Sequence, residues 1–197
     1  MHGDLGHLFL NMFALYMFGG PIERAWGSKR FLNYYLLTGF GAVILHTGIN
    51  AFEVKATEAE LQTYGVQMSA LNVAVSESTY DMTSAQATID ALHRSSGAPY
   101  DLLRQAFWDR AGVMIGASGA VFGVLLAFGM MFPDVQLFLL FPPIPIRAKY
   151  FVIGYGVLEL FSGMSRSPGD NVAHFAHLGG MIFGFIIIRY WRRQGQL

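Results

Sequence analysis

The chain has no cysteine among its 197 residues, and only 13% of its residues are charged. The absence of cysteine excludes disulfide bonds, thiol nucleophiles and thiolate metal sites. A soluble domain carries about 25% charged residues, so the low charged fraction argues against that class. The formal net charge is zero, and the overall charge therefore gives no indication of a nucleic-acid partner.

Long apolar segments dominate the chain instead. Hydrophobic residues make up 53% of it, and a helix needs about 20 apolar residues to cross a bilayer. We therefore predict an all-α, multi-pass membrane protein with five spans, in contact with a lipid bilayer. The predicted spans are Leu5–Gly19, Phe31–Phe52, Val113–Phe132, Lys149–Met164 and Val172–Trp191.

The links between these spans differ in character. Gly20–Arg30 is predicted to form a tight basic turn, and Ser165–Asn171 a short polar loop. Pro133–Ala148 contains too much proline for a continuous helix. Glu53–Arg110 is long and polar, with eight acidic and four basic residues. We predict that it is an insertion of short helices outside the membrane.

Local signals support helices within the insertion. Thr57 and Glu60 have the spacing of a capping box, which would start a helix there. Thr83–His93 contains few helix breakers, Ser95–Pro99 interrupts the pattern, and Leu102–Trp108 is apolar and aromatic. We interpret the insertion as a solvated surface, with substrate gating or partner binding as the functional alternative.

The distribution of lysine and arginine sets the predicted orientation, because cytoplasmic links carry an excess of both. The Gly20–Arg30 turn, the proline-rich link and the C-terminal tail would lie on the same side of the membrane. Together they hold eight of the thirteen basic residues: Arg24, Lys29, Arg30, Arg147, Lys149, Arg189, Arg192 and Arg193. The C-terminus is therefore predicted to be cytoplasmic, in a bacterial inner membrane, and the insertion extracytoplasmic. Ser118 and His177 each lie about five residues into spans that enter from the outer side, so we expect them at similar depth.

These two side chains suggest nucleophilic chemistry. A serine hydroxyl is a weak nucleophile and needs an adjacent base. His177 shares one helical stripe with Gly180 and Gly184, and Gly119 and Gly123 form a matching pair on the serine helix. Small residues at this spacing let membrane helices approach closely, so a hydrogen-bonded Ser118–His177 dyad is predicted.

The first span offers donors for a developing oxyanion. His7 and Asn11 lie at i and i+4, on one helix face, and both side chains carry N–H groups. Polar groups within a span are costly and indicate function by default.

Four motifs in this order resemble the rhomboid family of intramembrane serine proteases. They are His2-x4-His7-x3-Asn11, Gly20-x2-Glu23-x3-Gly27-Ser28-x-Arg30-Phe31, Gly116-x-Ser118-Gly119 and Ala176-His177-x-Gly179-Gly180-x3-Gly184. The resemblance covers nearly the whole chain except Glu53–Arg110. It implies one rhomboid-like membrane domain, residues 1–197, interrupted by the insertion at residues 53–110.

By this resemblance Ser118 is the nucleophile and His177 the general base of a serine endopeptidase. The oxyanion would be held by His7, Asn11 and the backbone N–H of Ser118. Gly116 would permit close backbone approach, and His2 would support the structure nearby. The resemblance implies no cofactor and no metal.

The family cleaves transmembrane segments of other proteins near their outer end. An intact helix hides its peptide bonds in internal hydrogen bonds, so a substrate should need a stretch that weakens its helix.

The sequence departs from the family pattern at two places. Family members have a helix and a membrane-embedded loop before the His2–Asn11 motif, so we predict a fragment that lacks an N-terminal span. Phe122 stands where a tyrosine often stacks on the catalytic histidine. The ring is retained, so we expect the stacking to survive.

Each polar residue also has a structural interpretation. Ser118 alone is compatible with helix packing, and Glu159 with either a polar contact between helices or a proton carrier. His174 would line the cavity or bond a loop carbonyl; a metal site at His174 and His177 lacks a third ligand in the sequence. The chain contains no His-Glu-x-x-His motif, which disfavours a zinc protease, and it does not complete Gly-x-Ser-x-Gly around Ser118.

Two other functional classes compete with the protease. An inactive rhomboid-like protein would bind or escort membrane proteins, but it should lack the serine or the histidine. A small transporter would show internal repeats or paired broken helices, which the sequence does not contain. No pattern in the sequence specifies an oligomeric state.

Overall fold

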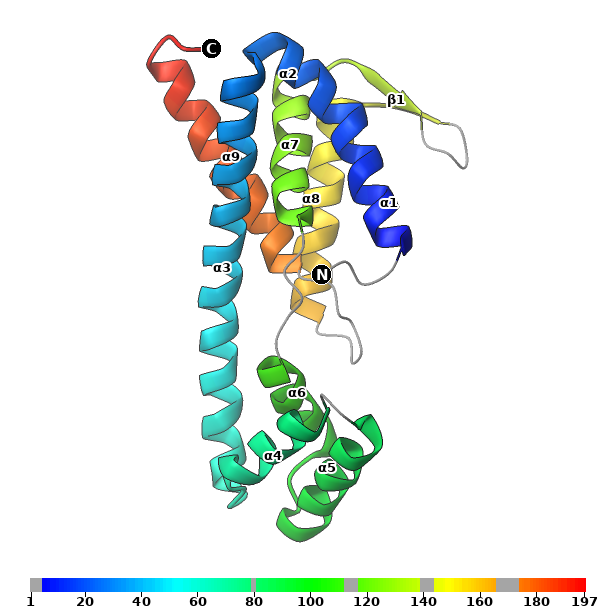
Figure 1. Cartoon of the computed structure of the whole chain (residues 1–197), viewed down its shortest axis with the longest axis vertical. Helices are drawn as coiled ribbons and strands as arrows, with labels where there is room; N and C mark the ends of the chain where they lie inside the picture. Colours follow the sequence, from blue (N-terminus) through cyan, green and yellow to red (C-terminus); the bar gives the residue numbers. More distant parts are fainter. Residues whose placement is uncertain (1–4, 79–80, 112–116, 139–143, 166–173) are drawn as a thin grey trace. The chain divides into compact units, whose positions relative to one another are not determined.

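The computed structural model describes residues 5–78, 81–111, 117–138, 144–165 and 174–197, and it is dominated by α-helices (Figure 1). The described residues divide into two compact units. The second unit holds residues 47–78 and 81–111, and the first unit holds the rest. The all-α class predicted from the sequence is confirmed.

The first unit begins with a helical segment that is longer than predicted. α1 (Leu5–Ala14) continues through a π-helical turn, η1 (Leu15–Gly19), into α2 (Gly20–Trp26). The predicted turn at Gly20–Arg30 is therefore wrong. Pro21 lies in the first turn of α2, where its missing N–H is not needed and the ring does not break the helix. The helical segment ends only at Gly27, whose φ of 80° favours glycine.

α3 (Ser28–Thr63) is one helix of 36 residues, so the predicted helix end near Phe52 is wrong. The predicted capping box is also wrong, because Thr57 lies inside α3 and donates to the carbonyls of Glu53 and Val54 at 3.0 Å. No glycine or proline occurs between residues 49 and 64. Nothing in the local sequence therefore ends the helix when the chain becomes polar.

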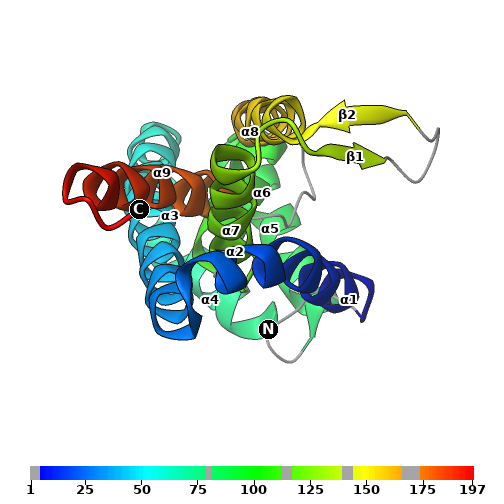
Figure 2. The same cartoon turned by 90° about the horizontal axis from the view of Figure 1, so that it is seen from above.

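The rest of the first unit is arranged around α7 (Ser118–Met131), which contacts α1, α2 and η1, together with α8 (Ala148–Ser165) and α9 (His174–Arg193). The described residues of the proline-rich link, 133–138 and 144–147, form no helix, as predicted, but they contain two strands that the sequence did not reveal. β1 (Gln136–Phe138) pairs antiparallel with β2 (Pro145–Arg147), and the two strands project outward from the N-terminal end of α8 (Figure 2).

Glycines allow the close contacts of α7 with its neighbours. A methyl group at Gly180 of α9 would overlap the backbone carbonyl of Gly119. A methyl group at Gly123 would lie 2.6 Å from Cβ of Thr38 in α3. Next to that contact, the buried hydroxyl of Tyr34 donates to the carbonyl of Gly123 at 2.8 Å. The close approach predicted from the glycine spacing is confirmed, and it includes α3 as a third helix.

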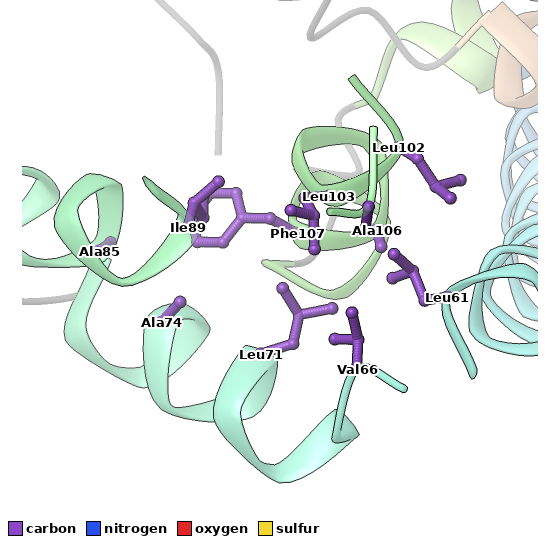
Figure 3. Close-up of a cluster of buried hydrophobic side chains, with 11 residues drawn as sticks. Leu61, Val66, Leu71, Ala74, Ala85, Ile89, Leu102, Leu103, Ala106 and Phe107 are labelled. Atoms are coloured by element: carbon purple, nitrogen blue, oxygen red, sulfur yellow. The ribbon is translucent and has the colours of Figure 1, made fainter. Parts of the chain in front are cut away.

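The second unit has its own apolar core. Besides the end of α3 it contains α4 (Met68–Ser78), α5 (Met82–Ser96) and α6 (Tyr100–Ala111). Figure 3 shows Leu71, Leu103 and Phe107 converging on one cluster. α5 ends at Gly97, in the left-handed conformation, so the predicted break at Ser95–Pro99 is confirmed. The placement of this unit outside a membrane remains a prediction.

Two of the described segments are long and apolar enough to cross a membrane, judged by length and composition: Leu5–Trp26 and Ser28–Thr63. α7 is apolar but shorter. The number of five spans therefore remains a prediction. Of the predicted loop at Ser165–Asn171, residues 166–171 lie outside the described part of the chain.

Candidate active site

Ser118 is the first residue of α7 and is 6% exposed. The sequence predicted that it lies about five residues into a span that begins at Val113. Residues 113–116 lie outside the described residues, and α7 begins directly after Ala117, which has a ψ of −8° and makes no side-chain hydrogen bond to the helix. The first backbone N–H groups of a helix have no acceptor within it. They also lie at the positive end of the helix dipole. The backbone N–H of Ser118 is therefore suited to bind a negative oxygen.

His177 lies in the first turn of α9 and is also 6% exposed. Its Nε2 is 2.9 Å from Oγ of Ser118. The two residues are 59 positions apart in the sequence, and the contact of Gly180 with Gly119 brings their helices together. The pair has the separation needed for proton transfer from the hydroxyl to the ring.

Phe122, one turn after Ser118, covers one face of the His177 ring. The ring centroids are 4.0 Å apart and the planes differ by 7°. The stacking predicted from the sequence is therefore confirmed. Phe122 also contacts the ring of Tyr155 in α8, at a centroid separation of 5.3 Å.

A third side chain, which the sequence did not place in the site, is Glu159 of α8. It is 4% exposed, and its Oε2 lies 2.9 Å from Nδ1 of His177 and 2.6 Å from Nδ1 of His174. A carboxylate only accepts hydrogen bonds, so both Nδ1 atoms donate to it. The signal that could have found it was an acidic residue inside an apolar segment. The interpretation as a polar contact between helices was correct but incomplete.

The same cluster supplies the third metal ligand that the sequence lacked. The ligand atoms of Glu159, His174 and His177 all lie within 4.8 Å of one another. Ligand atoms around a tetrahedral zinc ion are separated by about 3.3 Å, given bonds of about 2.0 Å. Both ring nitrogens are closer than that to one carboxylate oxygen. The observed geometry is that of a hydrogen-bonded cluster, and a zinc ion would require the carboxylate oxygen to move away from both nitrogens.

The two side chains predicted to bind the oxyanion, those of His7 and Asn11, lie on α1, which contacts α7. Asn11 is buried, and its Nδ2 donates to the carbonyl of His7 at 2.9 Å. An amide nitrogen has two hydrogens, so this bond uses one of them. His7 is half-buried on the same helix. His2 and Gly116 lie outside the described residues.

Comparison with known proteins places this site in a family. The family model of the rhomboid domain matches residues 1–72 and 86–194. The chain belongs to the rhomboid family. Rhomboid proteins are generally serine proteases of the membrane that act on transmembrane substrates within the bilayer. This chain is therefore an integral membrane protein.

Curated rhomboid relatives share modest identity with the chain. RHOMBOID-like protein 12, mitochondrial, of Arabidopsis thaliana is 27% identical, over 91% of this chain and 40% of its own length. A mitochondrial rhomboid protein of Schizosaccharomyces pombe is 28% identical, over 98% of this chain and 50% of its own length. RHOMBOID-like protein 4 of Arabidopsis thaliana is 24% identical, over 95% of this chain and 31% of its own length. No solved structure matches the chain.

The chain thus spans half or less of the length of these relatives. Two of them are described as mitochondrial. The comparisons therefore give no support to the predicted location of this rhomboid protein in a bacterial inner membrane.

Proposed function

We propose that this rhomboid-family protein is an intramembrane serine endopeptidase with Ser118 as nucleophile and His177 as general base. One observation carries the proposal: the buried hydroxyl of Ser118 lies 2.9 Å from Nε2 of His177. Two buried polar groups on separate helices would each be costly without a partner. Their direct contact offsets that cost and creates an activated hydroxyl.

The reaction would follow the general scheme of serine acyl transfer. Oγ of Ser118 attacks a substrate carbonyl while its proton moves to Nε2 of His177. The imidazolium then gives this proton to the leaving amine, and an acyl-enzyme remains on Ser118. Water, activated by the same histidine, releases the second product and restores the free serine.

The negative oxygen of the intermediate needs preorganised donors. We assign this role to the backbone N–H of Ser118 and to the side chains of His7 and Asn11. The first-turn position of Ser118 supports the assignment of its N–H. By resemblance to the family, Gly116 would allow close backbone approach and His2 would support the structure nearby.

The substrates would be transmembrane segments cut near the outer face of the bilayer. The first unit exposes many large apolar side chains that a bilayer would cover, including Leu36, Phe40, Ile44, Ile153, Val157, Phe161, Phe185 and Ile186. In the proposed topology the five spans leave the C-terminus cytoplasmic and the insertion at residues 53–110 on the opposite side. Ser118 would then be reached from the side of the insertion.

The alternative is an inactive rhomboid-like protein that binds or escorts membrane proteins. Such a protein has no need of a serine hydroxyl within hydrogen-bond distance of a histidine. The geometry of Ser118 and His177 therefore favours the protease.

The deciding experiment uses the full-length protein in liposomes with a reporter that carries a transmembrane segment. We expect wild-type protein to cleave the reporter and to react with a fluorophosphonate probe at Ser118. Ser118→Ala and His177→Ala should each abolish cleavage. Ser69→Ala, at an exposed serine of α4, is the matched control and should retain full activity.

Two outcomes contradict the protease proposal. One is cleavage by Ser118→Ala at the wild-type rate. The other is the absence of cleavage and of probe labelling in wild-type protein that still retains a bound transmembrane partner, which would favour the escort function.

A further inference from the structure

We propose that Glu159 is a positioning residue that holds His177 in the tautomer required for a general base. The inference rests on the proposed protease function and extends its dyad to a Ser118–His177–Glu159 triad. The evidence is a chain of two buried hydrogen bonds, each 2.9 Å long, from Ser118 Oγ to His177 Nε2 and from His177 Nδ1 to Glu159 Oε2.

The chemistry of these atoms determines the direction of both bonds. A carboxylate oxygen accepts only, so Nδ1 of His177 carries the hydrogen. The neutral ring has one N–H, so Nε2 is then unprotonated and accepts a hydrogen bond from the hydroxyl of Ser118. The opposite tautomer would aim an N–H at Ser118 and could not take its proton. Glu159 therefore selects the one tautomer that makes His177 a base.

The same contact supports the charged state formed during the reaction. When Nε2 takes the proton of Ser118, the ring becomes an imidazolium between Phe122 and the carboxylate of Glu159. In the Ser-His-Asp triad the carboxylate orients and stabilises the imidazolium without taking its proton. Glu159 would act in the same way: the Nδ1 proton stays on the ring, and only the Nε2 proton moves on to the leaving amine.

His174 would hold the carboxylate in place. Its Nδ1 lies 2.6 Å from the same oxygen that His177 uses, and the side chain of His174 is 12% exposed. It lies three residues before His177 on α9, so both rings reach Glu159 from the same side of that helix. Two donors from α9 on one oxygen of α8 restrict the carboxylate to the orientation that faces His177.

A structural role alone predicts a different result from a positioning role. If Glu159 only joins α8 to α9, its replacement should lower thermal stability and leave the properties of the His177 ring unchanged. If Glu159 selects the tautomer, its replacement should change the tautomer of the His177 ring and lower the rate of the chemical step. Substrate binding should be unaffected, because Glu159 faces the histidines.

The kinetic test uses the full-length protein in liposomes and the transmembrane reporter. We expect Glu159→Gln to lower kcat by about 10²–10⁴-fold with KM within threefold, because an amide can donate to Nδ1 and favour the wrong tautomer. Glu159→Asp keeps the carboxylate and should recover part of the activity. His174→Ala should lower kcat by roughly tenfold, and His174→Asn, which restores an N–H donor near the same position, should recover it. Glu60→Gln, at an exposed position of α3 outside the family motifs, is the control and should leave kcat unchanged.

A spectroscopic test reports the tautomer of His177 directly in the wild-type protein. In ¹⁵N-labelled wild-type protein, the ring signals of His177, assigned by their loss in His177→Asn, should show a protonated Nδ1 and a bare Nε2. Glu159→Gln should shift the ring toward the other tautomer.

The possible outcomes separate the two proposals. A wild-type His177 ring protonated at Nε2 would overturn the inference about Glu159. So would Ser118-dependent cleavage that stays within threefold of wild type in Glu159→Gln, while the protease proposal would stand. Cleavage that does not depend on Ser118 would instead remove the protease proposal.

Discussion

The ring of Phe122 lies flat against the imidazole of His177, with centroids 4.0 Å apart and an interplanar angle of 7°. This contact comes from the spacing on α7, because Phe122 lies one helical turn after Ser118 and therefore on the same face. One residue of α7 thus contacts Nε2 of His177, and another covers the face of its ring.

Removing this ring should loosen the histidine. A stacked aromatic pair contributes about 0.5–1.5 kcal/mol beyond area burial, so Phe122→Leu should lower kcat by up to about tenfold in the reporter assay. Phe122→Tyr keeps the ring and should retain at least half of the activity. Equal activity of Phe122→Leu and wild type would show that stacking does not position His177.

The contact of Gly180 with Gly119 should be essential for the geometry of the site. A methyl group at Gly180 would overlap the carbonyl of Gly119 and push α9 away from α7. Displacement of a catalytic group by about 1 Å costs about 10²-fold in rate, so Gly180→Ala should lower kcat at least that much and lower the Tm. Gly154→Ala in α8 is the matched control, because a methyl group there meets no atom within 4 Å. Wild-type activity in Gly180→Ala would contradict this packing.

Tyr34 should contribute to stability without contributing to catalysis. Its hydroxyl is buried and donates to the carbonyl of Gly123 at 2.8 Å. Tyr34→Phe removes this bond and should lower the free energy of unfolding by about 0.5–1.5 kcal/mol, measured by denaturation in detergent. Reporter cleavage at a temperature where both proteins are folded should be unchanged; a loss of kcat there would mean that the bond also positions α7.

The helix cap at Asp81 should make α5 sensitive to pH. Its carboxylate accepts from the hydroxyl of Ser84 and from the backbone N–H of Thr83, both at 2.8 Å. These bonds hold the pKa of Asp81 below its ordinary value. An acidic group whose pKa is lowered by folding stabilises the folded state at pH values above its ordinary pKa, which is about 3.9 for aspartate. This stabilisation is lost as the pH falls through the pKa of the folded state.

Hydrogen exchange of the α5 amides in the full-length protein measures this effect. Protection in wild type should fall between pH 6 and pH 3 by more than in Asp81→Asn, whose amide oxygen still caps the helix but does not titrate in this range. Asp81→Ala should reduce protection at both pH values. The same pH dependence in wild type and Asp81→Asn would exclude Asp81 as its source.

Several features could be predicted because they depend on local residue types. Helices were expected over most of α8 and α9, and the break at Gly97 followed from the cluster of small residues and proline. The predicted turn at Gly20–Arg30 and the predicted helix end near Phe52 were wrong for a common reason. Both predictions took polar or proline residues as signals that a helix ends, and in each place the backbone remains helical.

The residues of the chain by themselves determined the helical class, the family resemblance, the nucleophile and base candidates, and the ring beside the histidine. These follow from residue type and from spacing within one helix, which the periodicity of the α-helix converts directly into a shared face. The role of Glu159 was decided only by the tertiary structure. Its oxygen contacts His177 from a different helix, and no spacing along α8 specifies which residue of α9 will face it.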